Sequence, residues 1–127
     1  MKYINIINEN TIPFSKGNFA GWVSPKGIFH EVDMYQHEKF LDEKGITFGD
    51  AFNTGWIRIV KRGNELNIQC KGKNRAIDAI DILFPLFDKN IKIYLDFRNS
   101  YFSDLNPRNG ETFFLPHDKD KLYKFAR

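Results

Sequence analysis

The chain has 127 residues, of which 42% are hydrophobic and 13 are phenylalanine. This length fits one domain, and a chain of this size buries about two-thirds of its unfolded surface, enough for a core without disulfides or structural metals. The formal net charge of +3 is too small to indicate a nucleic-acid-binding protein by itself.

Cysteine usage and hydropathy predict the compartment. Cys70 is the only cysteine, so no disulfide can form within the chain. The first residues turn polar within a few positions, which argues against a signal peptide. No apolar run approaches the ~18–20 residues that a membrane span needs. We therefore expect a protein of the reducing cytoplasm that does not act at a membrane.

The N-terminal part predicts a strand and then a hairpin. Residues 3–7 favour a first strand, which polar residues and Pro13 end. Residues 19–23 and 28–32 flank the sequence Ser-Pro-Lys-Gly, in which proline and glycine favour a tight turn. These two segments are predicted to pair as an antiparallel hairpin.

A helix is expected directly after this hairpin. Asp33 is a candidate N-cap, and Gln36 follows at the spacing of a capping box. Gly45 stands where a helix commonly ends. Met34, His37 and Leu41 form an apolar stripe at helical spacing between these signals.

The next segments repeat the same order of elements. Residues 56–60 and 65–70 flank Arg-Gly-Asn, and the second segment alternates strictly between apolar and polar residues, as in a strand with one buried face. Asn74 is expected to cap a second helix that Pro85 shortens near its end. Residues 91–97 alternate again and predict a further strand.

The last thirty residues are rich in both aromatic and turn-forming residues. Asn109-Gly110 lies between the apolar segments 101–105 and 112–115, a pattern compatible with an irregular hairpin. Residues 117–127 are charged and fit a short terminal helix or a frayed end. We predict one α+β domain over 1–127, in the order β-ββα-ββα-β, with the helices on one face of a mostly antiparallel sheet and an irregular, aromatic-rich extension over 98–127.

The tryptophans mark an internal repeat. Gly21-Trp22-Val23 and Gly55-Trp56-Ile57 contain the only two tryptophans, and each copy opens a hairpin. A glycine before a bulky ring frees the backbone where that ring must pack. We interpret Trp22, Trp56 and the helical His37 as structural residues, with Trp22 the more exposed of the two tryptophans.

No motif for catalysis, metal binding or nucleotide binding is present, so no cofactor is expected. His30, Asp33 and His37 form the densest group of possible ligands or acid–base residues, since imidazole and carboxylate together suit zinc or iron. A zinc-protease helix needs a second histidine four residues after the first, and Leu41 stands there. Cys70 follows the apolar register of its strand, which predicts a buried and unreactive thiol.

The charges are distributed unevenly along the chain. Residues 31–50 carry an excess of four negative charges, whereas residues 56–75 carry an excess of five positive charges. Such surfaces raise the rate and specificity of association with a partner. The candidate partner-binding residues are an acidic set, Glu38, Asp42 and Glu43, and a basic set, Arg58, Lys61, Arg62, Lys71 and Lys73.

The repeat also carries a resemblance. The chain contains Gly21-Trp22-Val23-x-Pro25-x-Gly27-x-Phe29, then His37, and then Gly55-Trp56-Ile57-Arg58-Ile59. This pattern resembles that of small uncharacterised proteins of phages and mobile elements. Those proteins carry Gly-Trp-Ile-x-Pro-x-Gly-x-Phe and Gly-Trp-Ile-Arg-Ile. The resemblance covers residues 19–95 and implies a small protein that binds and blocks a protein of the host.

The sequence therefore favours a non-enzymatic interaction protein, an inhibitor of a host or defence protein that works through its charged surface. One alternative is an accessory nucleic-acid-binding domain that uses the basic second hairpin, with Tyr94, Tyr101 and Tyr123 available for stacking on bases. The other is a metal-dependent or acid–base enzyme around His30, Asp33 and His37.

Overall fold

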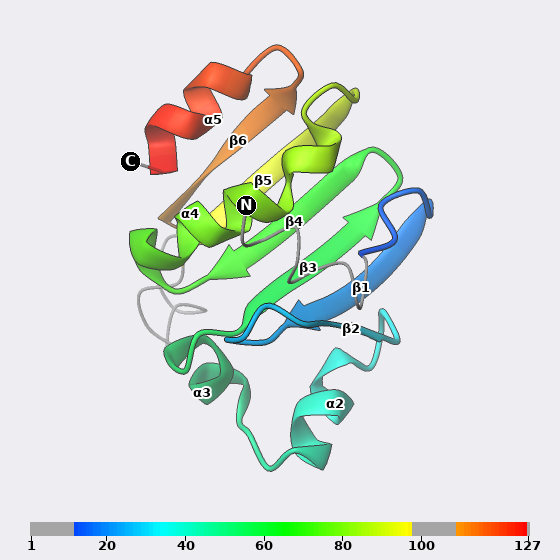
Figure 1. Cartoon of the computed structure of the whole chain (residues 1–127). Coiled ribbons are helices and arrows are strands. Elements are labelled where there is room, and N and C mark those ends of the chain that lie inside the picture. Colours follow the sequence, from blue (N-terminus) through cyan, green and yellow to red (C-terminus); the bar gives the residue numbers. More distant parts are fainter. Residues whose placement is uncertain (1–11, 98–108, 127) are drawn as a thin grey trace.

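The computed structural model describes residues 12–97 and 109–126 (Figure 1). These residues form a single α+β domain with a six-stranded, mostly antiparallel sheet. The first strand predicted over residues 3–7 and the apolar segment 101–105 lie outside the described residues. The elements are, in chain order, β1 (Asn18–Val23), β2 (Phe29–Val32), α2 (His37–Glu43), α3 (Phe48–Asn53), β3 (Ile57–Arg62), β4 (Glu65–Cys70), α4 (Gly72–Ile82), the 3₁₀ helix η1 (Phe84–Leu86), β5 (Ile91–Phe97), β6 (Asn109–Leu115) and α5 (Lys119–Ala126).

The strands lie in the order β2-β1-β3-β4-β5-β6. The two predicted hairpins form β1–β2 and β3–β4, and β1 also pairs with β3 in antiparallel register. The exception is β4–β5, which is parallel. Parallel neighbours need a long crossover, and here α4 and η1 supply it. The sheet is therefore mostly antiparallel, as predicted.

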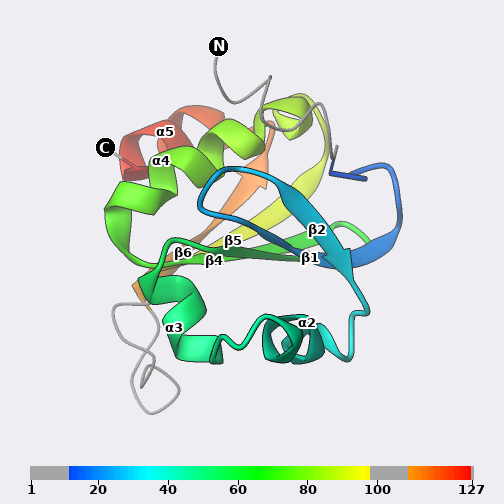
Figure 2. The same ribbon diagram turned by 60° about the horizontal axis from the view of Figure 1, so that its bottom comes forward.

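One face of the sheet, called the first face below, holds the main core. Alternation along each strand points one set of side chains toward α4 and α5, which lie over this face (Figure 2). Its members are almost all aliphatic or aromatic, and their burial supplies the main stabilising free energy. They include Phe19, Ile57, Ile59, Leu66, Ile68, Cys70, Ile93, Leu95 and Phe113.

The opposite, second face is covered in part by α2 and α3 (Figure 2). A smaller core lies there, formed by Trp22, Leu41, Ala51, Phe52 and Trp56. The prediction that all helices lie on one face is therefore wrong for α2 and α3. The reason is the position of Trp22 in β1, where alternation directs it away from the first face. Its large ring has to be covered from the other side.

The two Gly-Trp steps play different structural roles. A Cβ on Gly21 would overlap the ring of Phe29, so a glycine is needed for the neighbouring ring to cross the strand. Gly55 has φ of +100°, which favours glycine in the turn before β3. Both tryptophans are buried, with Trp22 0% exposed and Trp56 8% exposed. The expectation that Trp22 is the more exposed of the pair is wrong.

The first helical region is split in two. Asp33 Oδ1 accepts a hydrogen bond from the Tyr35 amide at 2.8 Å, so it closes a local turn and does not cap a helix. Helix α2 begins at His37 and ends before Gly45, whose φ is +71°. Helix α3 follows, with Thr47 Oγ1 accepting from the Asp50 amide at 3.1 Å. This second short helix was not predicted.

Two later predictions about helix ends have different outcomes. Helix α4 already begins at Gly72, with Lys71 as its N-cap residue, so the predicted cap at Asn74 is wrong. Pro85 does end the regular helix, because α4 stops at Ile82 and the proline lies in η1.

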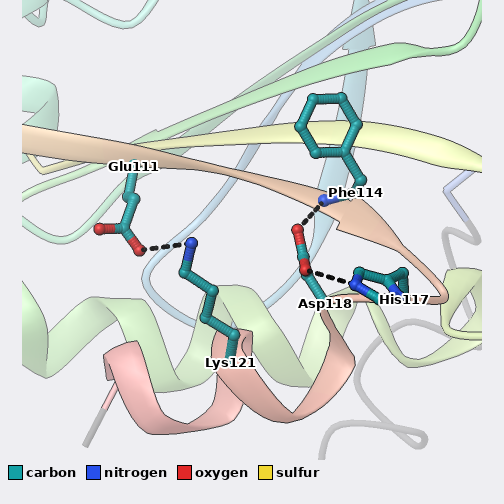
Figure 3. Close-up of polar contacts among 5 residues, drawn as sticks. All are labelled: Glu111, Phe114, His117, Asp118 and Lys121. Atoms are coloured by element: carbon teal, nitrogen blue, oxygen red, sulfur yellow. Dashed lines mark hydrogen bonds and ion pairs between the residues drawn. The ribbon is translucent and has the colours of Figure 1, made fainter.

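The C-terminal extension is regular where the structure describes it. Asn109 and Gly110 form the start of β6, where they pair with Phe97 and Asp96 of β5, so they are not the turn that the sequence suggests. The expected terminal helix is α5, and its Leu122 is fully buried in the main core. Asp118 precedes this helix and accepts a hydrogen bond from the Phe114 amide at 2.8 Å (Figure 3).

Candidate binding face of the sheet

The strand registers place the side chains of the second face in rows that cross the sheet. One row runs from His30 through Trp22, Arg58 and Gln69 to Asp96. Helices α2 and α3 cover its tryptophan end, and no described helix lies over the second face of β4, β5 and β6 (Figure 2). We call this part, over which no helix of the described residues lies, the open half. Its side chains are Arg58, Val60, Arg62, Glu65, Asn67, Gln69, Lys92, Tyr94, Asp96, Thr112 and Phe114.

A chain of hydrogen bonds crosses the open half from β3 to β5. Arg58 Nη1 donates to Gln69 Oε1 at 2.8 Å, and Gln69 Nε2 donates to Asp96 Oδ2 at 3.1 Å. Gln69 is 8% exposed and Asp96 only 2% exposed. Burial of a carboxylate is costly unless it is hydrogen-bonded, and a satisfied polar network holds its side chains in one arrangement. We call these three residues the polar row.

The small second core fixes one end of the polar row. The guanidinium carbon of Arg58 lies 5.7 Å from the ring centroid of Phe48, at the start of α3. Phe48 in turn packs edge-on against Trp22, with ring centroids 5.8 Å apart. Cation–π contact of this kind is favourable and orients the guanidinium plane. The first Gly-Trp step therefore positions Arg58 through α3.

Two hollows lie on or beside the open half. A cavity of about 150 Å³ stands over the polar row and is lined by Arg58, Val60, Arg62, Asn67, Gln69, Tyr94 and Asp96. A wider groove of about 500 Å³ lies at the adjacent end of the sheet and is lined by Asn64, Glu65, Asn90, Ile91, Lys92, Phe114, Leu115, Pro116 and His117. The first hollow is polar and the second is mainly apolar, so together they form a surface with two different chemistries.

Phe114 is the prominent apolar side chain of this surface. It is 55% exposed, and its ring projects from the side of β6 opposite α5 (Figure 3). The neighbouring Phe113 points the other way and is fully buried. Exposed aromatic side chains on a structured surface are typical anchors of protein interfaces.

The predicted basic set does not form one strip. Arg58 and Arg62 belong to the open half, but alternation turns Lys61 to the first face. There Lys61 is buried, and its ammonium donates to the carbonyl of Lys16 at 2.7 Å. Lys71 is exposed and donates to Asn53 Oδ1 at 2.6 Å, at the end of α3. The side chain of Lys73 lies outside the described residues.

The predicted acidic set forms a separate surface. Glu38, Asp42 and Glu43 are all exposed on α2. Helix α2 covers the second face near β1 and β2, so these carboxylates lie apart from the open half (Figure 2). The structure thus brings together two residues of the basic set and keeps the acidic set elsewhere.

His30 is held by aromatic rings. Its imidazole centroid lies 5.2 Å from that of Phe40 and 5.9 Å from that of Trp56. Burial, together with the nearby positive charge of Lys44, lowers the pKa of His30 below its usual 6.5. The neutral ring then packs like an aromatic side chain, and within residues 12–97 and 109–126 no group of three His, Cys, Asp or Glu residues is arranged to hold a metal ion. The side chain of His37 lies outside the described residues.

Cys70 lies in the main core. Burial raises its pKa to about 12, although the positive charge of Arg75 acts in the opposite direction. The thiolate is the reactive form of cysteine. At neutral pH the thiol is therefore protonated and inaccessible, as the apolar register of β4 predicts.

The signal for the open half was present in the sequence but incomplete. The polar positions of the alternating segments 65–70 and 91–97 face the same side as Arg58 and Arg62 once the strands are paired, whereas Lys61 faces the other side. The positive charges predict Arg58 and Arg62 as partner-binding residues, and the aromatic ring of Tyr94 is a candidate for stacking on bases. Gln69, Asn67 and Asp96 were not recognised, because a polar residue on an alternating strand ordinarily indicates only a wet face.

Comparison with known proteins does not assign the site. No family model, curated protein or solved structure matches this chain. None of the helices within the described residues is long and apolar enough to cross a membrane.

Proposed function

We propose that this protein is a non-enzymatic binding protein and that the open half of its sheet is the surface on which a partner protein docks. The observation that carries the proposal is the polar row, in which a nearly buried carboxylate and amide are held in fixed positions beside a cavity. Side chains held in place before binding lose little conformational entropy when a partner arrives. Sites of this kind are typical of recognition surfaces.

The composition of the open half also favours a protein partner. Arginine and aromatic side chains are enriched in protein interfaces, and this surface combines Arg58 and Arg62 with Tyr94 and Phe114. Cations and carboxylates alternate across it, since Lys92 Nζ lies 3.9 Å from Glu65 Oε1. Mixed charge of this kind gives specificity toward a complementary protein surface.

The finer part of the proposal comes from the resemblance to phage and mobile-element proteins. We propose that the partner is a host or defence protein and that binding blocks it, a task that needs a surface but no chemistry. We also propose a cytoplasmic location, because the single cysteine of the chain suits a reducing compartment.

A nucleic acid is the second candidate, favoured by one observation. Tyr94 and Phe114 lie on neighbouring strands of the open half, with Arg62 and Lys92 beside them. Aromatic rings and cations on an open sheet are used to bind single-stranded nucleic acids. A gel shift that weakens with rising salt would support this candidate, and no shift at low ionic strength would reject it.

The proposal is tested by two matched phenylalanine substitutions. Phe114 is 55% exposed on the open half, and Phe84 is 50% exposed near the end of α4, in the helical layer of the first face. Tagged wild-type protein, Phe114→Ala and Phe84→Ala are each used to capture proteins from the native host cell, and captured proteins are identified by mass spectrometry. We expect a partner that binds the wild type and Phe84→Ala, and at least tenfold less of it with Phe114→Ala.

Binding must then be reproduced with the purified partner in isothermal titration calorimetry. Circular dichroism verifies that both variants are folded. If Phe84→Ala loses the partner and Phe114→Ala keeps it, or if neither substitution changes capture, the assignment of the open half is wrong.

A further inference from the structure

We propose that the cavity over the polar row is a pocket for a carboxylate side chain of the partner, and that the adjoining groove receives an apolar side chain of the same extended segment. This inference rests on the proposed function and adds the chemistry of the bound segment. It follows from the charges, the available hydrogen-bond donors and the arrangement of the two hollows.

The charges lining the cavity leave one cation uncompensated. Asp96 accepts a hydrogen bond from Gln69, and Glu65 stands between its cross-strand neighbours Arg62 and Lys92, so the cations of the open half outnumber its two carboxylates by one. Arg62 is exposed at the rim of the cavity and makes no ion pair within residues 12–97 and 109–126. An incoming carboxylate would supply the missing negative charge in a bidentate contact.

The available donors point to the same ligand. Asn67 lines the cavity beside Arg62, and its amide makes no side-chain hydrogen bond to another described residue. A guanidinium carries five N–H donors and a side-chain amide two. Gln69 is fixed by its two hydrogen bonds, so the floor of the cavity is already oriented. An acceptor group with two oxygens therefore finds donors without rearrangement of the polar row.

A single carboxylate fits this surface better than a phosphate backbone does. A nucleic acid brings one negative charge with every nucleotide, and a strand crossing the open half would pass Glu65 as well as Asp96. Like charges at short range are repulsive. One carboxylate at Arg62 lies away from Asp96 and meets only Glu65, its cross-strand neighbour, whereas a nucleic acid brings a further charge with each nucleotide, so the observations favour an acidic protein segment.

The groove supplies the second contact. It is lined in part by Phe114, Leu115 and Pro116. From the strand spacing and rise, its centre lies on the order of 10 Å from that of the cavity, which an extended chain spans in about three residues. The expected segment therefore carries an acidic residue and, about three positions away, a large apolar residue.

Peptide titration of the full chain, followed by NMR, tests the pocket. The probe is acetyl-ESSL-amide, and the matched control is acetyl-QSSL-amide, which lacks only the charge. We expect the probe to shift the side-chain amide signals of Asn67 and the backbone amides around Arg62 and Phe114. The glutamine peptide should bind about tenfold more weakly, as should the glutamate peptide with Arg62→Gln.

Lys26→Gln is the matched control variant, since Lys26 is exposed in the β1–β2 turn and should not affect binding. Equal binding of the two peptides, shifts located elsewhere, or no shift at 50 mM peptide would overturn the inference. A twelve-residue oligothymidine is the third probe. If it binds the same amides more tightly than the acidic peptide and does so through Arg62, the ligand is a nucleic acid and the inference fails.

The inference and the proposed function can fail separately. A captured partner that requires Phe114 but binds Arg62→Gln as strongly as wild type would overturn the carboxylate pocket and leave the docking surface intact. Arg62-dependent peptide binding, without any partner that depends on Phe114, would support the pocket and contradict the docking surface.

Discussion

The two faces of this sheet are built from the same strands and serve different purposes. On the first face, β3, β4 and β5 present mainly aliphatic side chains that α4 and α5 bury. On the second face the same three strands present Arg58, Gln69 and Asp96, and no described helix covers β4 or β5. Because alternation separates the two sets, recognition residues can be placed on the open half with little loss of the apolar burial that stabilises the fold.

The second face is itself divided. Trp22 and Trp56 lie with α2 and α3 in a dry aromatic core, whereas the open half is polar. Arg58 stands at the boundary, in contact with Phe48 on one side and with Gln69 on the other. The aromatic core under α2 and α3 therefore positions Arg58 for the open half. The following substitutions test whether the two faces and the two parts of the second face have these separate roles.

The largest effect is expected from adjacent residues of β6 that point to opposite faces. Phe113→Ala should lower the free energy of unfolding by about 3–5 kcal/mol, because it leaves a cavity in the main core. Phe114→Ala should change it by less than about 1 kcal/mol, because the ring is more than half exposed. Urea denaturation followed by circular dichroism measures both. Equal losses would show that the open half also carries the stability of the fold.

Gly21→Ala tests how closely the chain must approach itself on the first face, beside Phe29 of the main core. The added Cβ would overlap the ring of Phe29 and stand 2.7 Å from the carbonyl oxygen of His30. We expect a loss of about 1–3 kcal/mol, the usual cost of overpacking. Gly17→Ala is the matched control, since a Cβ there meets nothing within 4 Å. Its free energy of unfolding should stay within about 0.5 kcal/mol of wild type.

The polar row should contribute to stability as well as to binding. Gln69→Ala removes the group that links Arg58 to Asp96, and we expect a loss of about 1–2 kcal/mol, because a buried carboxylate loses a donor. Asn67→Ala lies on the same strand and face, but its side chain makes no hydrogen bond to another described residue, so its effect on stability should be below about 0.5 kcal/mol. Thermal denaturation of both variants separates the two cases. A larger loss for Asn67→Ala would mean that the polar row is not what holds this face in place.

Alternation is local and strict in segments 65–70 and 91–97 and was sufficient to predict β4 and β5, whereas β3 was predicted over residues 56–60, where Ile57, Arg58 and Ile59 alternate. Alternation could not reveal that β4 and β5 are parallel neighbours, and this pairing aligns Gln69 with Asp96. The site was therefore recognised only through its charges, Arg58 and Arg62. Asn109-Gly110 was misread for the same reason, since its turn chemistry is local while its pairing with β5 is not. Helix α3 has six residues and one cap, a signal too short to detect.

The smallest expected effect concerns the titration of His30, on the covered part of the second face. Burial first and Lys44 second lower the pKa of this imidazole below 6.5. The unfolded chain therefore binds a proton more readily, so the contribution of His30 to stability is complete above pH 6.5 and is lost as the pH falls from 6.5 through the folded pKa. Lys44→Gln should raise the pKa of His30, although it stays below 6.5 because burial remains. NMR titration of the His30 ring protons measures both values. A pKa at or above 6.5 in the wild-type protein would contradict the burial of His30 in this part of the second face.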